Sequence, residues 1–385
     1  MSRTERLFDK NSKLNIFEAT VLSCKQTENG KYAVILDKTA FFPNEGGQTC
    51  DTGKIGGISV VSVDEKDGII THTLDHPLEI GETVHGEIDF EPRFKKMQNH
   101  TAEHIVSGII HRLFDFDNVG FHLGDGYMTA DFNGDLTEKD ITEVEALANR
   151  AVFECHPIRA YYPSAEELKM LEYRSKLDLT ENVRIVEIEG VDRCACCAPH
   201  VENTGEVGLV KITEAIRYKG GMRLTMLAGF DALADFCARQ EQIKHISMAI
   251  SAKQSEVAVG VDRVLAEIEQ LKSRISALKR ENMQMKLDSI ENTENSIIIF
   301  EDDGDMLALR NFVNGAVKKT EKLCAVFAGN DENGYKYIIA SENIPLRALS
   351  KEISAALGGK GGGSDVMIQG SVTATRTEIE QFFKF

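Results

Sequence analysis

The sequence lacks the long apolar run that a membrane-spanning helix requires. No window approaches roughly 18 consecutive apolar residues, and the first residues, MSRTERLFDK, contain no apolar segment of the kind found in a secretory signal. Cysteine is too sparse for a disulfide scaffold, with 8 in 385 residues. Three of these fall within 194–197, which favours metal binding or reactive thiols in a reducing compartment. We therefore expect a cytoplasmic protein with no membrane among its partners.

Positive charge is also in deficit. The chain has 44 lysines and arginines against 61 aspartates and glutamates, a formal net charge of −17. Since phosphate contacts supply much of the affinity for nucleic acids, such binding would need local basic patches. The sequence offers RFKK (93–96) and IRYKGGMR (216–223), the second with Arg217, Lys219 and Arg223 around a Gly-Gly turn. For each patch taken alone, solvated surface charge explains the pattern equally well.

The composition that is present, 42% hydrophobic and 27% charged, is that of a soluble globular chain long enough for two or three domains. Residues 15–90 alternate short β-rich runs with turn signals, which predicts a small barrel or sandwich. The apolar period then changes, and 94–114 is predicted to be a helix. A second helix is predicted after Thr137, which has Asp140 three residues later as in a weak capping box. β structure follows up to residue 230, so this part is α+β.

A proline-free, charge-rich helical stretch is predicted from Asp231 to about Ile290. Its apolar positions alternate steps of three and four residues, as in the a/d seam of a coiled coil. The seam consists of Val261, Val264, Ile268, Leu271, Ile275, Leu278, Asn282 and Met285. Asn282 at an a position is typical of a residue that fixes register or partner. Three interpretations stay open: a helical hairpin broken at Gly260, a dimeric coiled coil, or one long helix lying on the neighbouring domain.

Beyond this stretch, short strands and helices alternate before the glycine-rich GGKGGGSDVMIQGSV, which predicts a small α/β domain. We therefore expect an α+β fold in four parts. These are a small N-terminal β-barrel (1–91), an α+β domain with a metal site (92–230), a helical coiled-coil spacer (231–292) and a C-terminal α/β domain (293–385).

Two short motifs offer a complete set of ligands for one metal ion. His100 and His104 are four apart on a predicted helix and therefore project from the same face. Cys196 and His200 frame a Cys-x-x-x-His turn that Pro199 stiffens. By themselves, two histidines four apart are more often ordinary helix residues. Combined with the turn they give four nitrogen and sulfur ligands, which is the chemistry of tetrahedral zinc.

The pattern leaves the thiol ligand and the chemistry open. Cys194 and Cys197 compete with Cys196 for the metal. HTAEH (100–104) also fits H-x-x-E-H, the inverzincin protease signature, with Glu103 as the general base. That alternative requires a distant acidic third ligand and leaves the CACCAPH cluster unexplained.

A third stretch, LDKTAFFPNEGGQTCDTG (36–53), resembles the motif that opens the editing domain of alanyl-tRNA synthetases and of their free-standing relatives, the AlaX-type alanyl-tRNA editing proteins. In that family His-x-x-x-His follows, and then Cys-x-x-x-His with a trailing HV-x-N-T-G-E-(I/V)-G. This chain has HTAEH (100–104) and CCAPHVENTGEVG (196–208). Where the family commonly has Gly-Gly-Thr between the Cys and the His, this chain has Cys-Ala-Pro, which keeps the choice of thiol open.

The glycine-rich C-terminal segment is similar to part of the DHH-associated domain that ends alanyl-tRNA synthetases. The resemblance therefore covers nearly the whole chain and is to the long free-standing form, with no ATP-binding aminoacylation domain expected before the barrel. It implies hydrolysis of the ester between a wrong amino acid, serine or glycine, and the terminal ribose of tRNA(Ala). It also implies one zinc ion per chain, held by His100, His104, Cys196 and His200 in either a catalytic or an organising role.

Several residues are candidates for binding the substrate. Thr39 is the candidate for reading the serine hydroxyl, and Gln48 for positioning water or the terminal adenosine. Candidate tRNA contacts are Arg217, Lys219 and Arg223 at the acceptor stem, and Gly361, Gly362 and Gly363 at the RNA backbone. The partner is then the acceptor end of tRNA(Ala), and a homodimer would form through 257–290 or the C-terminal domain.

Two further alternatives stay open beside the peptidase. One is a zinc-organised tRNA-binding module without activity. The other is editing of threonyl-tRNA, whose domain shares the histidine motifs, although the GGQ segment and the glycine-rich C-terminus argue against it.

Overall fold

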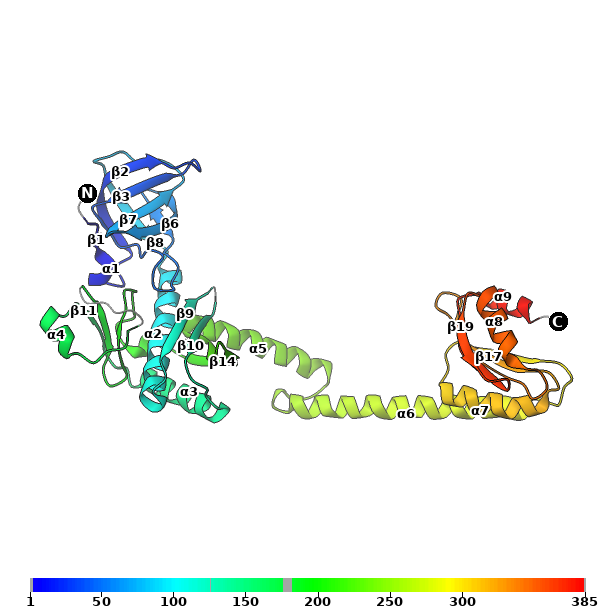
Figure 1. The fold of residues 1–385 in the computed structure, drawn as a ribbon. Helices are drawn as coiled ribbons and strands as arrows, with labels where there is room; N and C mark the ends of the chain where they lie inside the picture. Colours follow the sequence, from blue (N-terminus) through cyan, green and yellow to red (C-terminus); the bar gives the residue numbers. More distant parts are fainter. Residues whose placement is uncertain (1–2, 125, 176–181, 384–385) are drawn as a thin grey trace. The chain divides into compact units, whose positions relative to one another are not determined.

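The computed structural model describes residues 3–124, 126–175 and 182–383, and the chain divides into two compact units, Met1–Gln242 and Ile243–Phe385 (Figure 1). Helices and sheets occur in both units, so the predicted mixed α+β class is confirmed. Among the described residues, no helix is both long and apolar enough to cross a membrane. The finer division into four parts stays a prediction.

Six strands at the start of the first unit pair in a ring and close a small barrel (Figure 1). In ring order they are β2 (Ile16–Gln26), β3 (Tyr32–Leu36), β7 (Ile69–Leu74), β6 (Ile58–Lys66), β5 (Gly53–Ile55) and β8 (Thr83–Ile88), and neighbouring strands are antiparallel. Burial alternates along β7 and β8, because one face of each strand lines the interior. Strand β1 (Glu5–Arg6) pairs in parallel with β4 (Lys38–Thr39), and helix α1 (Leu7–Lys10) adds Phe8 to the barrel core.

Helix α2 (Phe90–Phe114) starts directly after the last barrel strand and forms the centre of the rest of this unit (Figure 1). Every residue from Met97 to Ile110 is buried, since α3 (Glu138–Phe153) and a four-stranded sheet cover the helix. In order, the strands of this sheet are β14 (Val210–Tyr218), β15 (Gly221–Ala228), β10 (Met128–Phe132) and β9 (Asn118–Leu123). Helix α3 begins at the predicted capping box of Thr137 and Asp140. The polar side chains on α2 are therefore enclosed by protein.

A three-stranded sheet carries the Cys-x-x-x-His turn. Its antiparallel strands are β11 (Ile158–Tyr161), β12 (Ile185–Ile188) and β13 (Asp192–Ala195), in that order. Helix α4 (Ala165–Met170) follows β11, and the single turn η1 (Thr204–Val207) follows the Cys-x-x-x-His turn. Because β13 packs against α2 and ends directly before Cys196, the turn leaves the sheet beside the histidine helix.

The helical stretch is broken, but not at Gly260. Helices α5 (Gly229–Ala249) and α6 (Val257–Ser289) are separated by residues 250–256, which include the turn η2 (Gln254–Glu256). Gly260 lies inside α6, where a side chain would overlap Ile250 and Ala252. The alternative with a break at Gly260 is therefore wrong, and this glycine permits close packing. Most a/d side chains of α6 are exposed, and the coiled coil stays a prediction.

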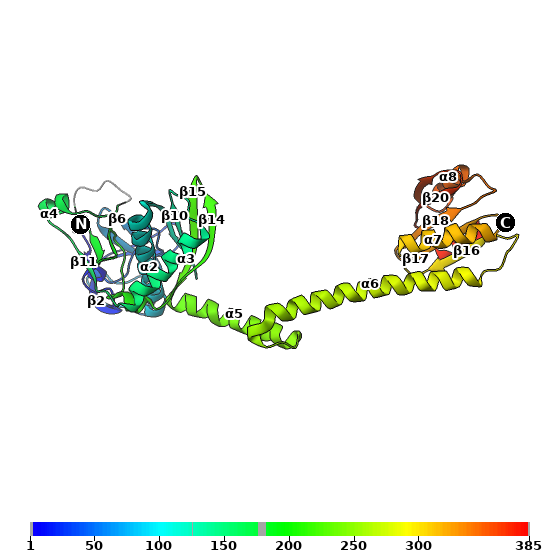
Figure 2. The same ribbon diagram turned by 90° about the horizontal axis from the view of Figure 1, so that it is seen from below.

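The second unit ends in a five-stranded sheet with helices on both faces (Figure 2). In order, its strands are β16 (Ile297–Glu301), β17 (Cys324–Asn330), β18 (Gly334–Ala340), β20 (Met367–Val372) and β19 (Lys360–Gly363), with β16 and β17 parallel and the other pairs antiparallel. One face packs against α7 (Met306–Ala316), the turn η3 (Val317–Lys319) and the end of α6. The other face packs against α8 (Leu346–Ala356) and α9 (Arg376–Phe382).

Gly361, Gly362 and Gly363 lie in β19, at the edge of this sheet. Their surroundings differ. A side chain at Gly361 would overlap the hydroxyl of Tyr337, which is 1% exposed, whereas at Gly362 no described atom lies within 4 Å of the place of a side chain. Packing therefore accounts for Gly361, and Gly362 is the glycine with open space beside it.

Gly361→Ala is expected to destabilise the C-terminal sheet by about 1–3 kcal/mol, the usual cost of an extra methyl group in a packed core. Gly362→Ala is the matched control and is expected to stay within about 0.5 kcal/mol of the parent. Hydrogen–deuterium exchange of peptides from β18 and β20, measured in the full chain, distinguishes the two. Equal protection in both variants would contradict the packing role of Gly361.

Candidate metal centre

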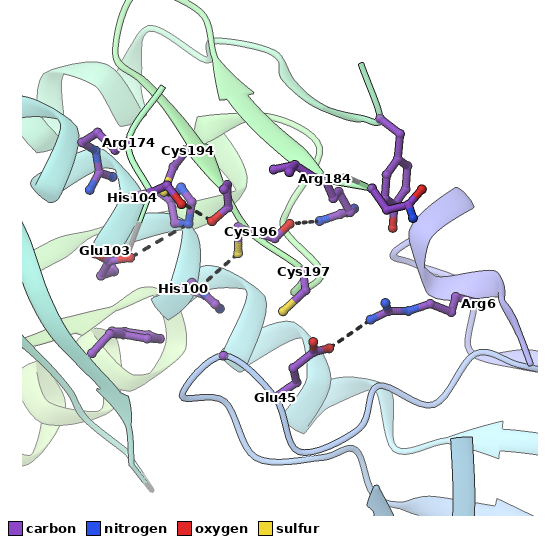
Figure 3. A pocket seen from close by; sticks show the side chains of 17 residues that line it. Arg6, Glu45, His100, Glu103, His104, Arg174, Arg184, Cys194, Cys196 and Cys197 are labelled. Atoms are coloured by element: carbon purple, nitrogen blue, oxygen red, sulfur yellow. Dashed lines mark hydrogen bonds and ion pairs between the residues drawn. The ribbon is translucent and has the colours of Figure 1, made fainter. Parts of the chain in front are cut away.

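Four side chains that are far apart in the sequence converge at one point in the first unit. Figure 3 shows three of them, His100, His104 and Cys196. One ligand atom from each of His100, His104, Cys196 and His200 lies within 4.8 Å of the others. The Cys196 sulfur is 3.3 Å from His200 Nε2 and 3.6 Å from His100 Nε2. Two ligands come from α2 and two from the turn after β13. Three imidazoles and a thiol at this spacing can surround a single cation.

Each of the three imidazoles makes a hydrogen bond through its Nδ1 atom, on the side of the ring opposite the centre. His100 Nδ1 lies 3.0 Å from Gln48 Oε1, and His104 Nδ1 lies 3.1 Å from Asp192 Oδ2. His200 Nδ1 lies 3.0 Å from Thr101 Oγ1. Since the Gln48 and Asp192 oxygens accept hydrogen bonds, His100 and His104 donate through Nδ1–H and keep the Nε2 lone pair. Metal-bound histidines in proteins are usually oriented in this way.

The structure separates the three candidate thiols (Figure 3). The Cys196 sulfur faces the histidines, whereas Cys197 lies near Glu45, and burial, with the charge of Glu45 adding to it, raises the pKa of the Cys197 thiol to about 12. Cys194 is buried and belongs to a second group with His104 and Asp192. The Asp192 carboxylate of that group is already bonded to Arg174, so Cys196 completes the better set.

Protonation at the centre fits a cation. Burial raises the pKa of the Cys196 thiol well above its usual value, and the neighbouring cysteines act in the same direction. Burial lowers the pKa of His200 well below its usual value, with His104 and His100 adding to the effect. The imidazole therefore stays neutral with a lone pair to donate, and a divalent cation is the partner that would convert a buried thiol to a thiolate.

Asp192 and Arg174 form a buried pair behind His104. Arg174 donates to the carboxylate through Nε at 2.7 Å and Nη2 at 2.8 Å. Burial acts to raise the pKa of Asp192, but the hydrogen bonds from His104 and Arg174 outweigh it and lower this pKa to about 2. The carboxylate is therefore ionised at neutral pH and can orient His104.

Sequence reasoning missed Asp192, Thr101 and Arg174. Alternation along β13 places Asp192 and Cys194 on the buried side, and this period of two could have found the aspartate. No comparable signal exists for Arg174, because it lies in an irregular segment 18 residues from its partner.

A cavity of about 350 Å³ opens beside His100, His104 and Cys196. Phe121 lines it and contacts His100 in a tilted arrangement, with ring centroids 4.7 Å apart. Glu103 also lines it and accepts hydrogen bonds from Ser107 and Asn118. Tyr162 and three arginines from separate parts of the chain form much of the rest of the wall: Arg6, Arg174 and Arg184. The cavity combines ring faces with charged groups, as a small-molecule site does.

The Gly-Gly-Gln loop reaches this centre from the barrel. A side chain at Gly47 would lie 2.8 Å from the Phe121 carbonyl oxygen, and the Gly47 carbonyl accepts a bond from Leu123 N–H at 3.0 Å. Gly47 also has φ +82°, so glycine is required for both reasons. This close approach brings Gln48 to His100. The Nε2 atom of Gln48 is buried and has no hydrogen-bond partner among the described residues.

A buried ion pair fixes this loop to the histidine helix. Arg93 donates through Nε to Asp51 at 2.8 Å and through Nη2 to the same carboxylate, and both side chains are 1% exposed. Arg93 also donates to the carbonyls of Ser12 and Ala40. The interpretation of RFKK as a nucleic-acid patch is therefore wrong for Arg93, which is engaged in the interior.

Thr39 lies in the barrel core and not in the cavity wall. It is fully buried, its hydroxyl is 2.9 Å from His72 Nε2, and it accepts a bond from Phe41 N–H. His72 Nδ1 lies 3.3 Å from the Val34 carbonyl. With Nδ1–H donating to Val34, the Thr39 hydroxyl donates to Nε2. Its reading of a serine hydroxyl stays a prediction.

The buried His72 predicts a loss of stability in acid. Burial lowers its pKa from 6.5 to about 4, so the folded state favours neutral imidazole and the unfolded state binds the proton first. The contribution is fully present above pH 6.5 and is lost as the pH falls through about 4. Between pH 7 and pH 5, the resulting loss in the free energy of unfolding is about 2 kcal/mol. Urea unfolding of the parent and of His72→Gln should show this difference in pH dependence, and parallel curves would contradict it.

The predicted basic residues lie on the β14–β15 hairpin. Arg223 donates to the Asp131 carboxylate through Nε and Nη2, at 2.6 and 2.8 Å, and so braces the hairpin. The Arg217 side chain is 84% exposed and lies 3.4 Å from Asp135. Lys219 occupies the turn with φ +48°. Arg217 and Lys219 are therefore the residues that present positive charge to solvent.

Three family models match separate parts of the chain. Residues 5–92 match the class II (A) tRNA synthetases, residues 183–226 the second additional domain of threonyl and alanyl tRNA synthetases, and residues 294–385 the DHHA1 domain. The alanyl-tRNA editing protein AlaX-L of Pyrococcus horikoshii is 28% identical and aligns with 97% of this chain and 96% of its own length. The chain resembles the long alanyl-tRNA editing proteins. The resemblance predicted from the motifs is thereby confirmed.

Alanine–tRNA ligases are similar as well, over part of their length. Those of Methanococcus vannielii and Thermofilum pendens are 28% and 29% identical and align with 99% and 97% of this chain. The chain spans 43% of the length of each ligase.

Proposed function

We propose that this chain is a trans-editing hydrolase that deacylates tRNA(Ala) carrying serine or glycine, with one zinc ion per chain. The supporting observation is the convergence of His100, His104, Cys196 and His200 beside the Gly-Gly-Gln loop. It occurs in a chain whose relatives are an alanyl-tRNA editing protein and alanine–tRNA ligases.

The residues fit zinc by their donor atoms, their tautomers and their spacing. When bound, zinc supplies Lewis-acid chemistry to an ester carbonyl or to a water. Because an aminoacyl ester is already activated, the chain itself has mainly to bind the substrate and orient it. A cavity of about 350 Å³ is suited to the aminoacyl group and part of the terminal nucleoside.

Gln48, which contacts the cavity residue His100, is proposed to bind the substrate. Its Oε1 holds His100, which leaves the two N–H donors of the buried Nε2 for an oxygen of the ester or ribose. An unmet buried donor costs free energy, so a ligand that satisfies it gains affinity. Thr39 remains the proposed reader of the serine hydroxyl.

Contacts with tRNA are proposed at two places. Arg217 and Lys219 offer exposed charge for the acceptor stem, with Arg223 bracing their hairpin. Gly362 offers open space for the RNA backbone at the edge strand β19, flanked by Gly361 and Gly363. The exposed apolar seam of α6, or the C-terminal domain, remains the proposed surface for a homodimer.

The test is incubation of the purified protein with Ser-, Gly- and Ala-tRNA(Ala), with and without a chelator. We expect release of serine and glycine, retention of alanine, and loss of activity once the metal is removed. Release of alanine at a similar rate would contradict the proposal. Tight tRNA binding without deacylation would instead identify a tRNA-binding module.

The peptidase alternative makes a different prediction for Glu103. The Oε1 atom of Glu103 is bonded to Ser107 and Asn118, and its Oε2 is 4.0 Å from His104 Nε2. If Glu103 is held as part of the framework, Glu103→Gln keeps much of the deacylation rate. Peptide hydrolysis that disappears in Glu103→Gln would favour the peptidase.

A further inference from the structure

Arg184, which belongs to none of the sequence motifs, hydrogen-bonds to the turn that carries Cys196. Arg184 directly precedes β12, and its Nη1 donates to the carbonyls of Cys196 at 3.0 Å and Ala198 at 2.9 Å. The Cys196 N–H in turn donates to the Arg184 carbonyl at 3.0 Å. The Arg184 side chain is 6% exposed. One guanidinium therefore fixes the backbone on both sides of residue 197.

The charge of this arginine is matched by Asp9 of helix α1. Arg184 Nε lies 3.4 Å from Asp9 Oδ1, and the Asp9 side chain is 11% exposed. Tyr162 donates its hydroxyl to Asp9 Oδ2 at 2.9 Å. Burial raises the pKa of Tyr162 to about 12, with Asp9 adding to the effect, so this hydroxyl remains a donor at neutral pH. Asp9 is thus held in place as the partner of Arg184.

The Asp9 carboxylate is also connected, through Arg6, to the loop that carries Gln48. Arg6 Nε lies 3.5 Å from Asp9 Oδ2, and Arg6 Nη2 is 3.0 Å from Glu45 (Figure 3). Glu45 lines the same cavity as Cys197 and stands three residues before Gln48. Asp9 is therefore linked both to the turn that carries Cys196 and to the loop that carries Gln48.

We propose that Asp9 and Arg184 are positioning residues for the metal centre, which hold the Cys196–Ala198 turn so that the Cys196 thiol faces His100 and His200. The inference rests on the proposed metal site. Without Arg184, two buried carbonyls lose their donor, and the turn relaxes to recover hydrogen bonds. A ligand needs to move by only a fraction of an ångström for metal affinity to fall.

The experiment measures cobalt(II) binding by the full chain, by competition with a chelator and by the thiolate-to-cobalt absorption band. We expect Arg184→Met to bind cobalt about 10–100-fold more weakly, as is usual when a residue that holds a metal ligand by hydrogen bonds is removed, with a weaker thiolate band. Asp9→Asn should weaken binding in the same direction. Arg184→Lys, which keeps one donor, should recover part of the affinity.

Arg193→Met is the matched control. Arg193 lies on β13 of the same sheet and pairs with Glu187, away from the ligands. It should bind cobalt as the parent does. Parent-like affinity and spectrum in Asp9→Asn and Arg184→Met would overturn the inference, and Asp9→Asn decides alone if Arg184→Met fails to fold. Failure of the parent chain to bind cobalt would instead overturn the proposed metal site.

Discussion

Cys196→Ala is expected to lose the metal and to reduce deacylation of Ser-tRNA(Ala) to the uncatalysed background. Removing a residue that hydrogen-bonds a metal ligand weakens metal binding by about 10–100-fold. Removing the thiol abolishes a metal–ligand bond itself, so a larger effect is expected. The Cys196 sulfur also lies close to two imidazoles, 3.3 Å from His200 Nε2 and 3.6 Å from His100 Nε2. Metal content after gel filtration and single-turnover deacylation measure the two losses.

Cys197→Ala is the control that identifies the thiol. Cys197 lies near Glu45 and does not belong to the group of three histidines and Cys196. We expect it to retain one metal ion per chain. If Cys197→Ala lost the metal while Cys196→Ala kept it, the ligand assignment would be wrong, whatever the activity of the chain.

The candidate metal-binding residues could be predicted in pairs because local geometry sets the relation within each pair. Residues 100 and 104 share a face on any α-helix, and residues 196 and 200 are brought together by a tight turn. The meeting of the two pairs could be predicted only from the family resemblance. It depends on the packing of β13 against α2, which joins residues about ninety positions apart and leaves no periodic signal.

The residues that hold the ligands were less predictable, for the same physical reason. Arg184 and Arg174 act through hydrogen bonds to segments that only the tertiary fold brings near. Arg93 looked like surface charge because a sequence pattern does not reveal a buried acidic partner 42 residues earlier. Gly361 likewise looked like a residue for backbone approach, whereas the Tyr337 hydroxyl from another strand requires it.

Asp51→Ala is expected to lower the free energy of unfolding of the first unit by about 3–5 kcal/mol. Arg93 would be left buried and charged without its partner, and this is the costly way to break a buried ion pair. Asp51 also accepts a bond from Phe42 N–H at 2.6 Å, so the base of the Gly-Gly-Gln loop would lose its anchor. Urea unfolding of the full chain, followed by circular dichroism, measures the change.

An exposed ion pair on helix α2 is the control that shows whether burial, and not charge pairing alone, makes the loss of Asp51 costly. Glu91 pairs with Lys95 at 3.0 Å, but its side chain is 75% exposed, and exposed pairs contribute only about 0–1 kcal/mol. Glu91→Gln should therefore cost far less than Asp51→Ala. The double variant Asp51→Ala/Arg93→Met removes both charges and should cost less than the sum of the single changes. If the free-energy cost of the double variant equalled the sum of the single costs, Asp51 and Arg93 would contribute independently. Their ion pair would then not explain why the Gly-Gly-Gln loop lies at the metal centre.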